Sequence, residues 1–306
     1  MTSWRGVVIA LTLCAAVTPV SAQDRTVEGQ VLVAADSGPP VPRRGQMVVL
    51  HRVGSDRAAP LDSTRTGTGG RFRFRYEATG SPDALYFVSA MHAGVGYFSP
   101  PLRSVTVSGG DADILVHDTT SDASSLHTQG RHLVVAQPRG TNRDIAEIFE
   151  TDNPAPRTFV PAPSVTPTWT TILPPEAESI AVAPGDVAAS AVKFRSGRAE
   201  LYAPLSPGVR QLVLTYLLPV DAFPVTVPMQ RPLSVLEVLI EEPRAEVSGA
   251  GLAEGAPAPI EGRMFRRFIA QDVPASAVVT VDAPSPAGQN SAALRVLLVG
   301  LAAGML

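Results

Sequence analysis

The sequence predicts an all-β protein with two β-sandwich domains in tandem. Three observations favour this fold: apolar and polar residues alternate with a period of two in many segments, turn residues separate these segments at short intervals, and the 306-residue chain contains 29 prolines and 25 glycines. Proline and glycine are typical of turns and interrupt helices, so long helices are not expected. The hydrophobic content of 45% is sufficient for packed cores.

The charge of the chain excludes one class of partner. Its formal net charge is −3. A protein that binds a nucleic acid needs a basic domain or stripe to contact phosphates. We therefore expect no nucleic-acid partner.

Residues 1–22 have the organisation of an export signal. Arg5 gives a weakly positive start, an apolar run extends from Val7 to Val17, and Pro19 precedes the small residues Ser21 and Ala22, which suit a signal peptidase. The run is too short to span a bilayer comfortably. The alternative interpretation is a buried core helix. Export is preferred, and it would place the mature protein outside the cytoplasm.

Cys14 is the one cysteine of the chain and lies inside this apolar run. A lipoprotein signal would need a small residue before the cysteine, where Leu13 stands. If the signal is removed, the mature protein has no cysteine, which excludes disulfides and thiolate metal sites.

The first domain is predicted at residues 26–118. Its clearest strand is Phe72-Arg73-Phe74-Arg75-Tyr76-Glu77, in which the aromatic residues face one side and the charged residues the other. Further strands are expected from the same pattern at 27–33, 47–52, 85–91, 105–107 and 114–116. The turns between them predict an antiparallel sandwich.

Several motifs of this domain resemble those of a known family. They are Val27-x-Gly29-x-Val31, Gly38-Pro39-Pro40-Val41, Val48-x-Leu50, Thr66-x-x-Gly69-Gly70-Arg71-Phe72-x-Phe74 and Tyr86-x-Val88-x-Ala90. The domain resembles the transthyretin-like (carboxypeptidase regulatory-like) domain, a seven-stranded, immunoglobulin-like sandwich common in bacterial envelope proteins. The family usually has Asp where this chain has Gly67. The resemblance implies a fold and no reaction.

A linker is predicted at residues 119–126, which are mostly small and polar. A second β-sandwich domain is predicted at residues 127–285. Its strands are expected at 132–136, 145–150, 179–182, 191–194, 198–203, 211–218, 235–240, 265–270 and 277–282. Residues 154–175 are predicted to be extended, and residues 249–259 to form a loop rich in Gly, Ala and Pro.

The C-terminal segment, residues 291–306, predicts a transmembrane helix, either complete or truncated. Arg295 is followed by eleven uncharged residues, and Gly300 and Gly304 allow close helix contact. A buried C-terminal helix and a processed sorting tail remain as alternatives. An anchor would place the preceding domains on the periplasmic face of the membrane.

Candidate sites for chemistry are weak. His127 and His132 are five residues apart, a spacing that puts them on opposite faces of a strand, and no metal motif connects the remaining histidines. Asp111 and Asp113 lack the further ligands of a calcium loop, so they are interpreted as turn residues. Ser190-x-x-Lys193 matches a nucleophile motif literally, but the segment is predicted as strand rather than helix. The sequence therefore predicts no enzyme, no catalytic residue, no cofactor and no metal site.

Two surface features are candidates for binding. Aromatic residues could line a sugar-binding face, although core packing is the simpler interpretation; they are Tyr86, Phe87, Tyr97, Phe98, Phe159 and Trp169. Arg71, Arg73 and Arg75 form a row on one strand face, interpreted as solvated. We expect a non-catalytic, membrane-tethered envelope protein that binds an envelope protein partner. The alternative is a carbohydrate-binding module that binds a polysaccharide through the first sandwich.

Overall fold

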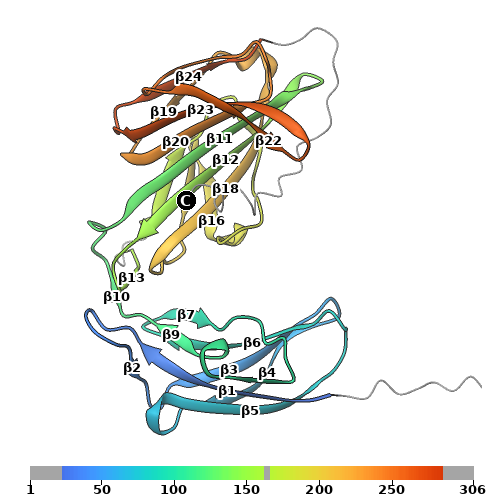
Figure 1. The fold of residues 1–306 in the computed structure, drawn as a ribbon, viewed down its shortest axis with the longest axis vertical. Helices are drawn as coiled ribbons and strands as arrows, with labels where there is room; N and C mark the ends of the chain where they lie inside the picture. Colours follow the sequence, from blue (N-terminus) through green and yellow to red (C-terminus); the bar gives the residue numbers. More distant parts are fainter. Residues whose placement is uncertain (1–22, 162–165, 285–306) are drawn as a thin grey trace, which may run out of the picture. The chain divides into compact units, whose positions relative to one another are not determined.

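The computed structural model describes residues 23–161 and 166–284 and is built almost entirely from β-strands (Figure 1), which confirms the all-β prediction. The chain divides into two compact units, the first mainly from residues up to Leu115 and the second mainly from Val116 onward. The predicted signal peptide (1–22), Cys14 within it, and the predicted C-terminal helix (291–306) lie outside the described residues. No helix in the described ranges is long and apolar enough to cross a membrane.

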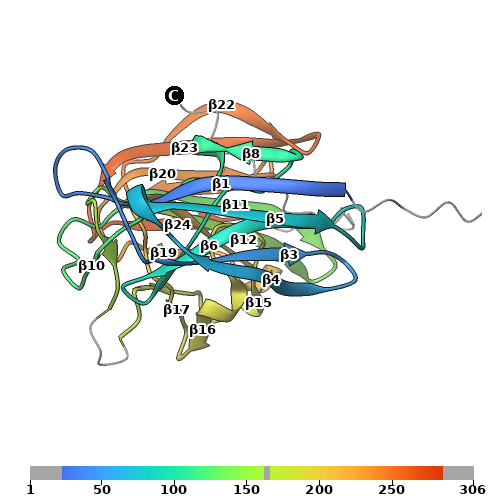
Figure 2. The ribbon, with the colours of Figure 1, turned by 90° about the horizontal axis from the view of Figure 1, so that it is seen from below.

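The first unit contains two sheets. The five-stranded sheet consists of β2 (Val41–Pro42), β1 (Gln23–Val33), β5 (Arg71–Ala78), β8 (Thr106–Ser108) and β9 (Ile114–Val116). The four-stranded sheet has the order β4 (Ala58–Arg65), β3 (Met47–Val53), β6 (Leu85–His92) and β7 (Val95–Phe98). Two short 3-10 helices, η1 (Thr68–Gly70) and η2 (Gly109–Asp111), lie between strands. In the view of Figure 2, β1 and β5 run above β3 and β4.

Alternation along the strands builds the core of this unit, as the sequence predicts. In β3, β5 and β6, every second side chain is buried and those between are half-buried or exposed. The buried set includes Val48, Leu50, Phe72, Phe74, Tyr86 and Val88. One pairing differs from the prediction: β1 pairs with β8 in parallel, so the sandwich is not purely antiparallel. The pairing of β1 with β5 is antiparallel.

Gly29 lies where β1 crosses closely over the rest of the core. A Cβ atom at this position would lie 2.7 Å from the carbonyl oxygen of Ala112 and 2.7 Å from Cζ of Phe72. Carbon atoms do not approach a backbone oxygen this closely without displacement. The glycine of the Val27-x-Gly29-x-Val31 motif is therefore required by packing.

The second unit is organised around a seven-stranded sheet. Its order is β15 (Glu178–Val182), β18 (Gly208–Pro219), β12 (Asn142–Asn153), β11 (His127–Arg139), β20 (Leu233–Ile240), β23 (Arg263–Val273) and β22 (Ala253–Ile260). Two three-stranded sheets accompany it: β14 (Trp169–Ile172), β17 (Arg198–Leu201) and β16 (Val192–Arg195), and β19 (Val225–Pro228), β24 (Val278–Asp282) and β21 (Glu246–Gly249). The short elements are β10 (Thr119–Thr120), β13 (Thr158–Phe159), η3 (Ala189–Ala191) and η4 (Val220–Ala222).

Both small sheets contribute to one large core with the seven-stranded sheet. This core joins Leu133, Ile145, Leu214 and Val238 of the large sheet to residues of both small sheets, among them Trp169, Leu201, Val227 and Val281. A smaller cluster lies on the opposite face of the large sheet and contains Val134, Ala146, Ile148, Val213, Leu239 and Phe265. The central strands are therefore apolar on both faces, which explains their nearly continuous hydrophobic sequence.

One segment prediction is wrong, and the structure has two further parallel pairings that the sequence did not predict. Residues 249–259, predicted as a loop, contain the edge strand β22, which pairs with β23 across a register shift between Gly255 and Ala258. The predicted linker 119–126 begins with β10, which pairs in parallel with β13. Pairing of β11 with β20 is also parallel, which makes the large sheet mixed.

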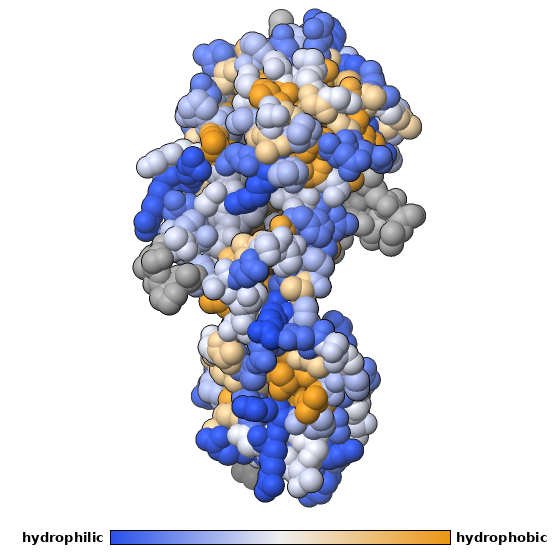
Figure 3. All heavy atoms as spheres, turned by 90° about the vertical axis from the view of Figure 1, so that its left-hand side faces the viewer, coloured by the Kyte–Doolittle hydropathy of each residue, from blue (hydrophilic) through white to orange (hydrophobic). Residues whose placement is uncertain are grey.

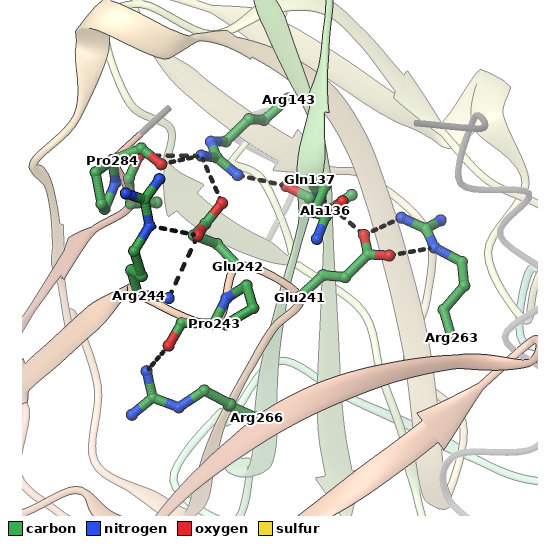
Figure 4. Close-up of polar contacts among 11 residues, drawn as sticks. Ala136, Gln137, Arg143, Glu241, Glu242, Pro243, Arg244, Arg263, Arg266 and Pro284 are labelled. Carbon is green, nitrogen blue, oxygen red and sulfur yellow. Dashed lines mark hydrogen bonds and ion pairs between the residues drawn. The ribbon is translucent and has the colours of Figure 1, made fainter. Parts of the chain in front are cut away.

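At one end of the large sheet, buried and half-buried charged side chains form hydrogen bonds and ion pairs (Figure 4). The fully buried Arg143 on β12 donates to the backbone oxygens of Ala136, Ala283 and Pro284, at 3.0, 3.0 and 3.1 Å. Its guanidinium lies 4.0 Å from the buried carboxylate of Glu242. Arg143 thus ties the residues after β24 to the start of β12.

Candidate functional site

The outer face of the four-stranded sheet in the first unit carries the most prominent exposed hydrophobic residues. Alternation along β6 and β7 turns Met91 and Phe98 outward, and they are 60% and 63% exposed. Leu85 and Val53 are exposed on the same strand faces. In Figure 3, hydrophobic residues reach the surface of the first unit on the side in view. A monomer gains nothing from exposing such residues together, so this face is a candidate binding surface.

Three contacting aromatic rings form the centre of this face, which we call the Phe87–Phe98 surface. His51 on β3 is opposite Phe87 on β6, and their rings stack with centroids 5.0 Å apart and an interplanar angle of 15°. Phe98 on β7 meets Phe87 edge to face, with centroids 5.8 Å apart. Aromatic pairs in these geometries hold one another in place. The surface is therefore ordered before any ligand arrives.

Polar groups at the Phe87–Phe98 surface are few and are already paired. The Nε2 atom of His51 forms a 2.8 Å hydrogen bond with Oγ of Ser89. Burial lowers the pKa of His51, so the ring is neutral at pH 7. Gly96 leaves room beside the rings, since a Cβ atom there would lie 3.4 Å from Sδ of Met91. The arrangement can bind an apolar or flat ligand, and its polar groups are the His51 ring and the Ser89 hydroxyl bonded to it.

The other aromatic candidates lie in the cores. Tyr86 and Tyr97 face the inside of the first unit, and Phe159 and Trp169 are buried in the second. Phe87 and Phe98 alone among the six contribute to the outer face. Core packing was therefore the correct interpretation for four of them.

Arg71, Arg73 and Arg75 form the exposed row that the sequence predicts on β5. Arg73 pairs with Glu28 of β1 at 3.0 Å, with both side chains about half exposed. Such a pair contributes little to stability. Asp113 accepts a 2.7 Å hydrogen bond from the backbone N–H of Gln30, which agrees with a role in a turn.

The remaining candidate residues do not converge on one site. His127 lies 3.4 Å from Asp152, and His132 lies 2.6 Å from Glu237. Ser190 lies in η3, not in the strand that the sequence predicts there, while the Lys193 ammonium lies over the ring of Tyr202, 4.6 Å from its centroid. Within residues 23–161 and 166–284, no group of three or more His, Cys, Asp or Glu side chains is placed to hold a metal ion.

The sequence reasoning missed two buried ionic clusters in the seven-stranded sheet. In the large core, Arg131 donates to Glu147 at 3.0 and 2.6 Å, and Glu147 also accepts from the hydroxyl of Tyr216. Burial, with the Glu147 charge beside it, raises the pKa of Tyr216 well above its usual value. The available signal was a charged residue repeated within otherwise apolar strands, as in Arg131 and Glu147.

The second cluster lies on the opposite face of the sheet. Nδ1 of His132 is 2.6 Å from Glu237, and its Nε2 is 3.8 Å from Glu150. Arg267 donates to the other oxygen of Glu237 at 2.5 Å. Burial by itself lowers the pKa of His132, but Glu150 and Glu237 outweigh it and raise this pKa to about 9. His132, Glu150, Glu237 and Arg267 therefore pair with one another on this face of the sheet.

Comparisons with known proteins give only weak structural similarity. No family model and no curated protein sequence matches it. Among solved structures, an M1 zinc metallopeptidase from Deinococcus radiodurans is similar over 51% of this chain, with 15% identity and a TM-score of 0.32. The chain covers 42% of that enzyme, well under two thirds of its length.

Two further solved structures are similar at the same low level. A DUF3823 family protein from Parabacteroides merdae is 10% identical over 63% of this chain and 81% of its own, with a TM-score of 0.25. The major pilin SpaA of Corynebacterium diphtheriae is 13% identical over 85% of this chain and 84% of its own, with a TM-score of 0.22. All these scores are too low to carry an argument about function.

Proposed function

We propose that this protein is a non-catalytic module of the cell envelope that binds another protein through the Phe87–Phe98 surface. The observation that carries the proposal is the exposure of Phe98 and Met91 on an ordered sheet face. Aromatic residues and methionine are enriched in the centres of protein interfaces, where charged residues are depleted. The lack of nucleophile and metal motifs in the sequence supports a binding role over catalysis.

The placement of this module belongs to the same proposal and rests on the sequence. Residues 1–22 would direct export, and residues 291–306 would tether the protein to the periplasmic face of the membrane. The first unit would be a transthyretin-like domain, in agreement with its motifs and its two packed sheets. The tandem domain boundaries, 26–118 and 127–285, are part of the proposal.

Carbohydrate binding by the first unit is the second candidate function. The specific observation in its favour is the continuous aromatic strip of His51, Phe87 and Phe98. The C–H faces of sugar rings pack on exposed aromatic rings, and the few polar groups nearby could orient a hydroxyl group. This candidate also uses the Phe87–Phe98 surface, so a single set of variants tests both.

Site-specific photo-crosslinking tests the protein partner. A benzoylphenylalanine at position 98, in the full chain expressed in cells with the native envelope, is expected to give one discrete cross-linked product. The control carries the same group in place of Leu115 on β9, which is 44% exposed on the other sheet. Equal products at both positions, or none at position 98, would contradict the proposal.

The variant Phe98→Ala separates the two candidates. Its expected effect on partner binding is about a tenfold loss or more, because truncation of a central aromatic residue costs about 2 kcal/mol. Affinity electrophoresis in envelope polysaccharides gives the other readout. Retardation of the unchanged protein that disappears in Phe98→Ala but remains in Leu115→Ala would favour carbohydrate binding instead.

A further inference from the structure

A small cavity lies at one end of the seven-stranded sheet in the second unit. Its walls come from β11, β12, β14 and the residues before β20, and they include Arg131, Phe149, Trp169, Thr171, Gln230 and Arg231. Its volume is about 20 Å³. A volume of roughly 10–15 Å³ is needed for one water molecule, so the cavity holds about one water-sized group.

Arg231 brings an uncompensated charge to this cavity. Its guanidinium is half-buried, lies 5.6 Å from the centre of the Trp169 ring, and donates to the backbone oxygen of Thr170 at 3.3 Å. Burial lowers the pKa of Arg231, and no acidic side chain in the described part of the chain opposes this effect. A partly desolvated cation without a counter-charge is costly to a protein.

The neighbouring Arg131, in contrast, has hydrogen-bond acceptors and a counter-charge for its guanidinium. Its guanidinium donates twice to Glu147 and once to the backbone oxygen of Pro228, at 3.1 Å. Arg131 is therefore neutralised within the core. The charge available to a ligand belongs to Arg231 alone.

Trp169 supplies a second unmatched group at the same place. The residue is 6% exposed, and its Nε1 atom is buried without a hydrogen-bond acceptor. Buried donors in native structures almost always have an acceptor. In the walls of one cavity, an indole N–H without an acceptor and a guanidinium that has a backbone oxygen but no carboxylate opposite it among the described residues point to an anion.

We propose that this cavity binds one carboxylate group, which accepts hydrogen bonds from Arg231 and from Nε1 of Trp169. A carboxylate is planar, pairs well with a guanidinium, and can insert a single oxygen into a space of this size. The site lies in the second unit and is independent of the function proposed for the Phe87–Phe98 surface.

An adjoining hollow leaves room for the rest of a ligand. It has a volume of about 260 Å³ and shares Thr128 and Leu233 with the small cavity. His127, Ser234 and Asp272 also line it; the first two can donate hydrogen bonds, and the Asp272 carboxylate can accept them from the rest of the ligand. The carboxylate can thus belong to a small organic acid or to the end of a peptide.

Indole N–H signals in ¹H–¹⁵N NMR spectra of the full chain test the proposal. The chain has two tryptophans, and Trp169→Phe assigns the relevant signal. We expect acetate to shift the Trp169 signal saturably, with a Kd of roughly 1 mM, as suits a ligand of about four heavy atoms. Acetamide, which has the same shape without the charge, is expected to leave the signal in place.

Substitutions at the cavity test whether the acetate-induced shift of the Trp169 signal arises there. Arg231→Gln is expected to weaken acetate binding at least about tenfold, because it removes a charge-assisted hydrogen bond. The control Arg195→Gln removes an exposed arginine of the same unit and should leave binding unchanged. If Arg231→Gln does not fold, Trp169→Phe, followed by calorimetry, still reports the loss of the indole donor.

Two further ligands identify the source of the carboxylate. A short peptide with a free C-terminal carboxylate is compared with its amidated form, and glucuronate with glucose. Tighter binding of the free peptide than of acetate indicates a peptide ligand, and tighter binding of glucuronate indicates an acidic sugar. An equal response to acetate and acetamide, or unchanged binding in Arg231→Gln, would overturn the proposal and leave a bound water as the occupant.

Discussion

His132 is the single residue whose charge should govern the pH dependence of stability. Its pKa of about 9 in the folded protein exceeds the value of about 6.5 expected in the unfolded chain. The protonated ring thus stabilises the fold fully below pH 6.5, and this contribution is lost as the pH rises through 9. Integrated over that interval, the loss is on the order of 3 kcal/mol.

We therefore predict that the free energy of unfolding falls between pH 6.5 and pH 9.5, and that His132→Gln removes most of this slope. Urea denaturation at several pH values measures both quantities. Groups that face the ring are Glu150 and Glu237, whose pKa values are lowered by the interactions they make with His132, against the effect of burial, and, through Glu237, Arg267. His127→Gln, on the same strand but largely exposed, is the control. An unchanged slope in His132→Gln would contradict the assignment.

The pairing of the buried charged residues in the large sheet was difficult to predict from the sequence. A sequence shows that Arg131, Glu147 and Glu237 interrupt apolar strands, but it does not show which strands are neighbours. Glu147 meets Arg131 because β11 and β12 form a hairpin, whereas His132 meets Glu237 across a distant pairing. The first contact was accessible to local reasoning and the second was not.

At the scale of elements, Gly29 permits β1 to lie against the core. We predict that Gly29→Ala lowers the free energy of unfolding by about 1–3 kcal/mol, because overpacking displaces the Ala112 backbone or the Phe72 ring. Gly110→Ala, where nothing lies within 4 Å of the added Cβ, is the matched control. Chemical denaturation of both variants checks the prediction, and equal stability of the two would refute it.

Edge strands explain most of the elements that the sequence did not predict. β22 has the sequence Ala-Glu-Gly-Ala-Pro-Ala-Pro-Ile, with few side chains to bury and Pro257 at its register shift. Proline is tolerated at an edge because only one side of the strand is hydrogen-bonded. β4 is also an edge strand and is mostly exposed, so it lacks an alternating apolar pattern. Central strands, with buried alternation, were predicted well.

At the scale of the whole molecule, the all-β class followed from the sequence because side-chain alternation is a local property. Sheet order and the parallel pairings did not follow, since they depend on contacts between distant segments. The proposed binding surface has a partial sequence signal: the aromatic candidates include Phe87 and Phe98, but alternation alone does not say which sheet face stays uncovered. The cavity at Arg231 had no sequence signature.

The proposed tether makes a prediction for the complete chain. Cell fractionation is expected to recover the full-length product with the membranes and to require detergent for its release. A variant without residues 291–306 is expected in the soluble periplasmic fraction, because about fifteen apolar residues supply the affinity for the bilayer. Recovery of the full-length chain without detergent would contradict the tether.

The parallel pairing at the centre of the large sheet has a consequence for how the chain acquires its structure. His132 and Glu237 are neighbours although 105 residues separate them. β11 can pair with β20 only after the chain between them has been synthesised. Such contacts between distant residues give the sheet a high contact order, so it should form slowly. Until then, the edge of β11 that later pairs with β20 is unpaired and open to other strands.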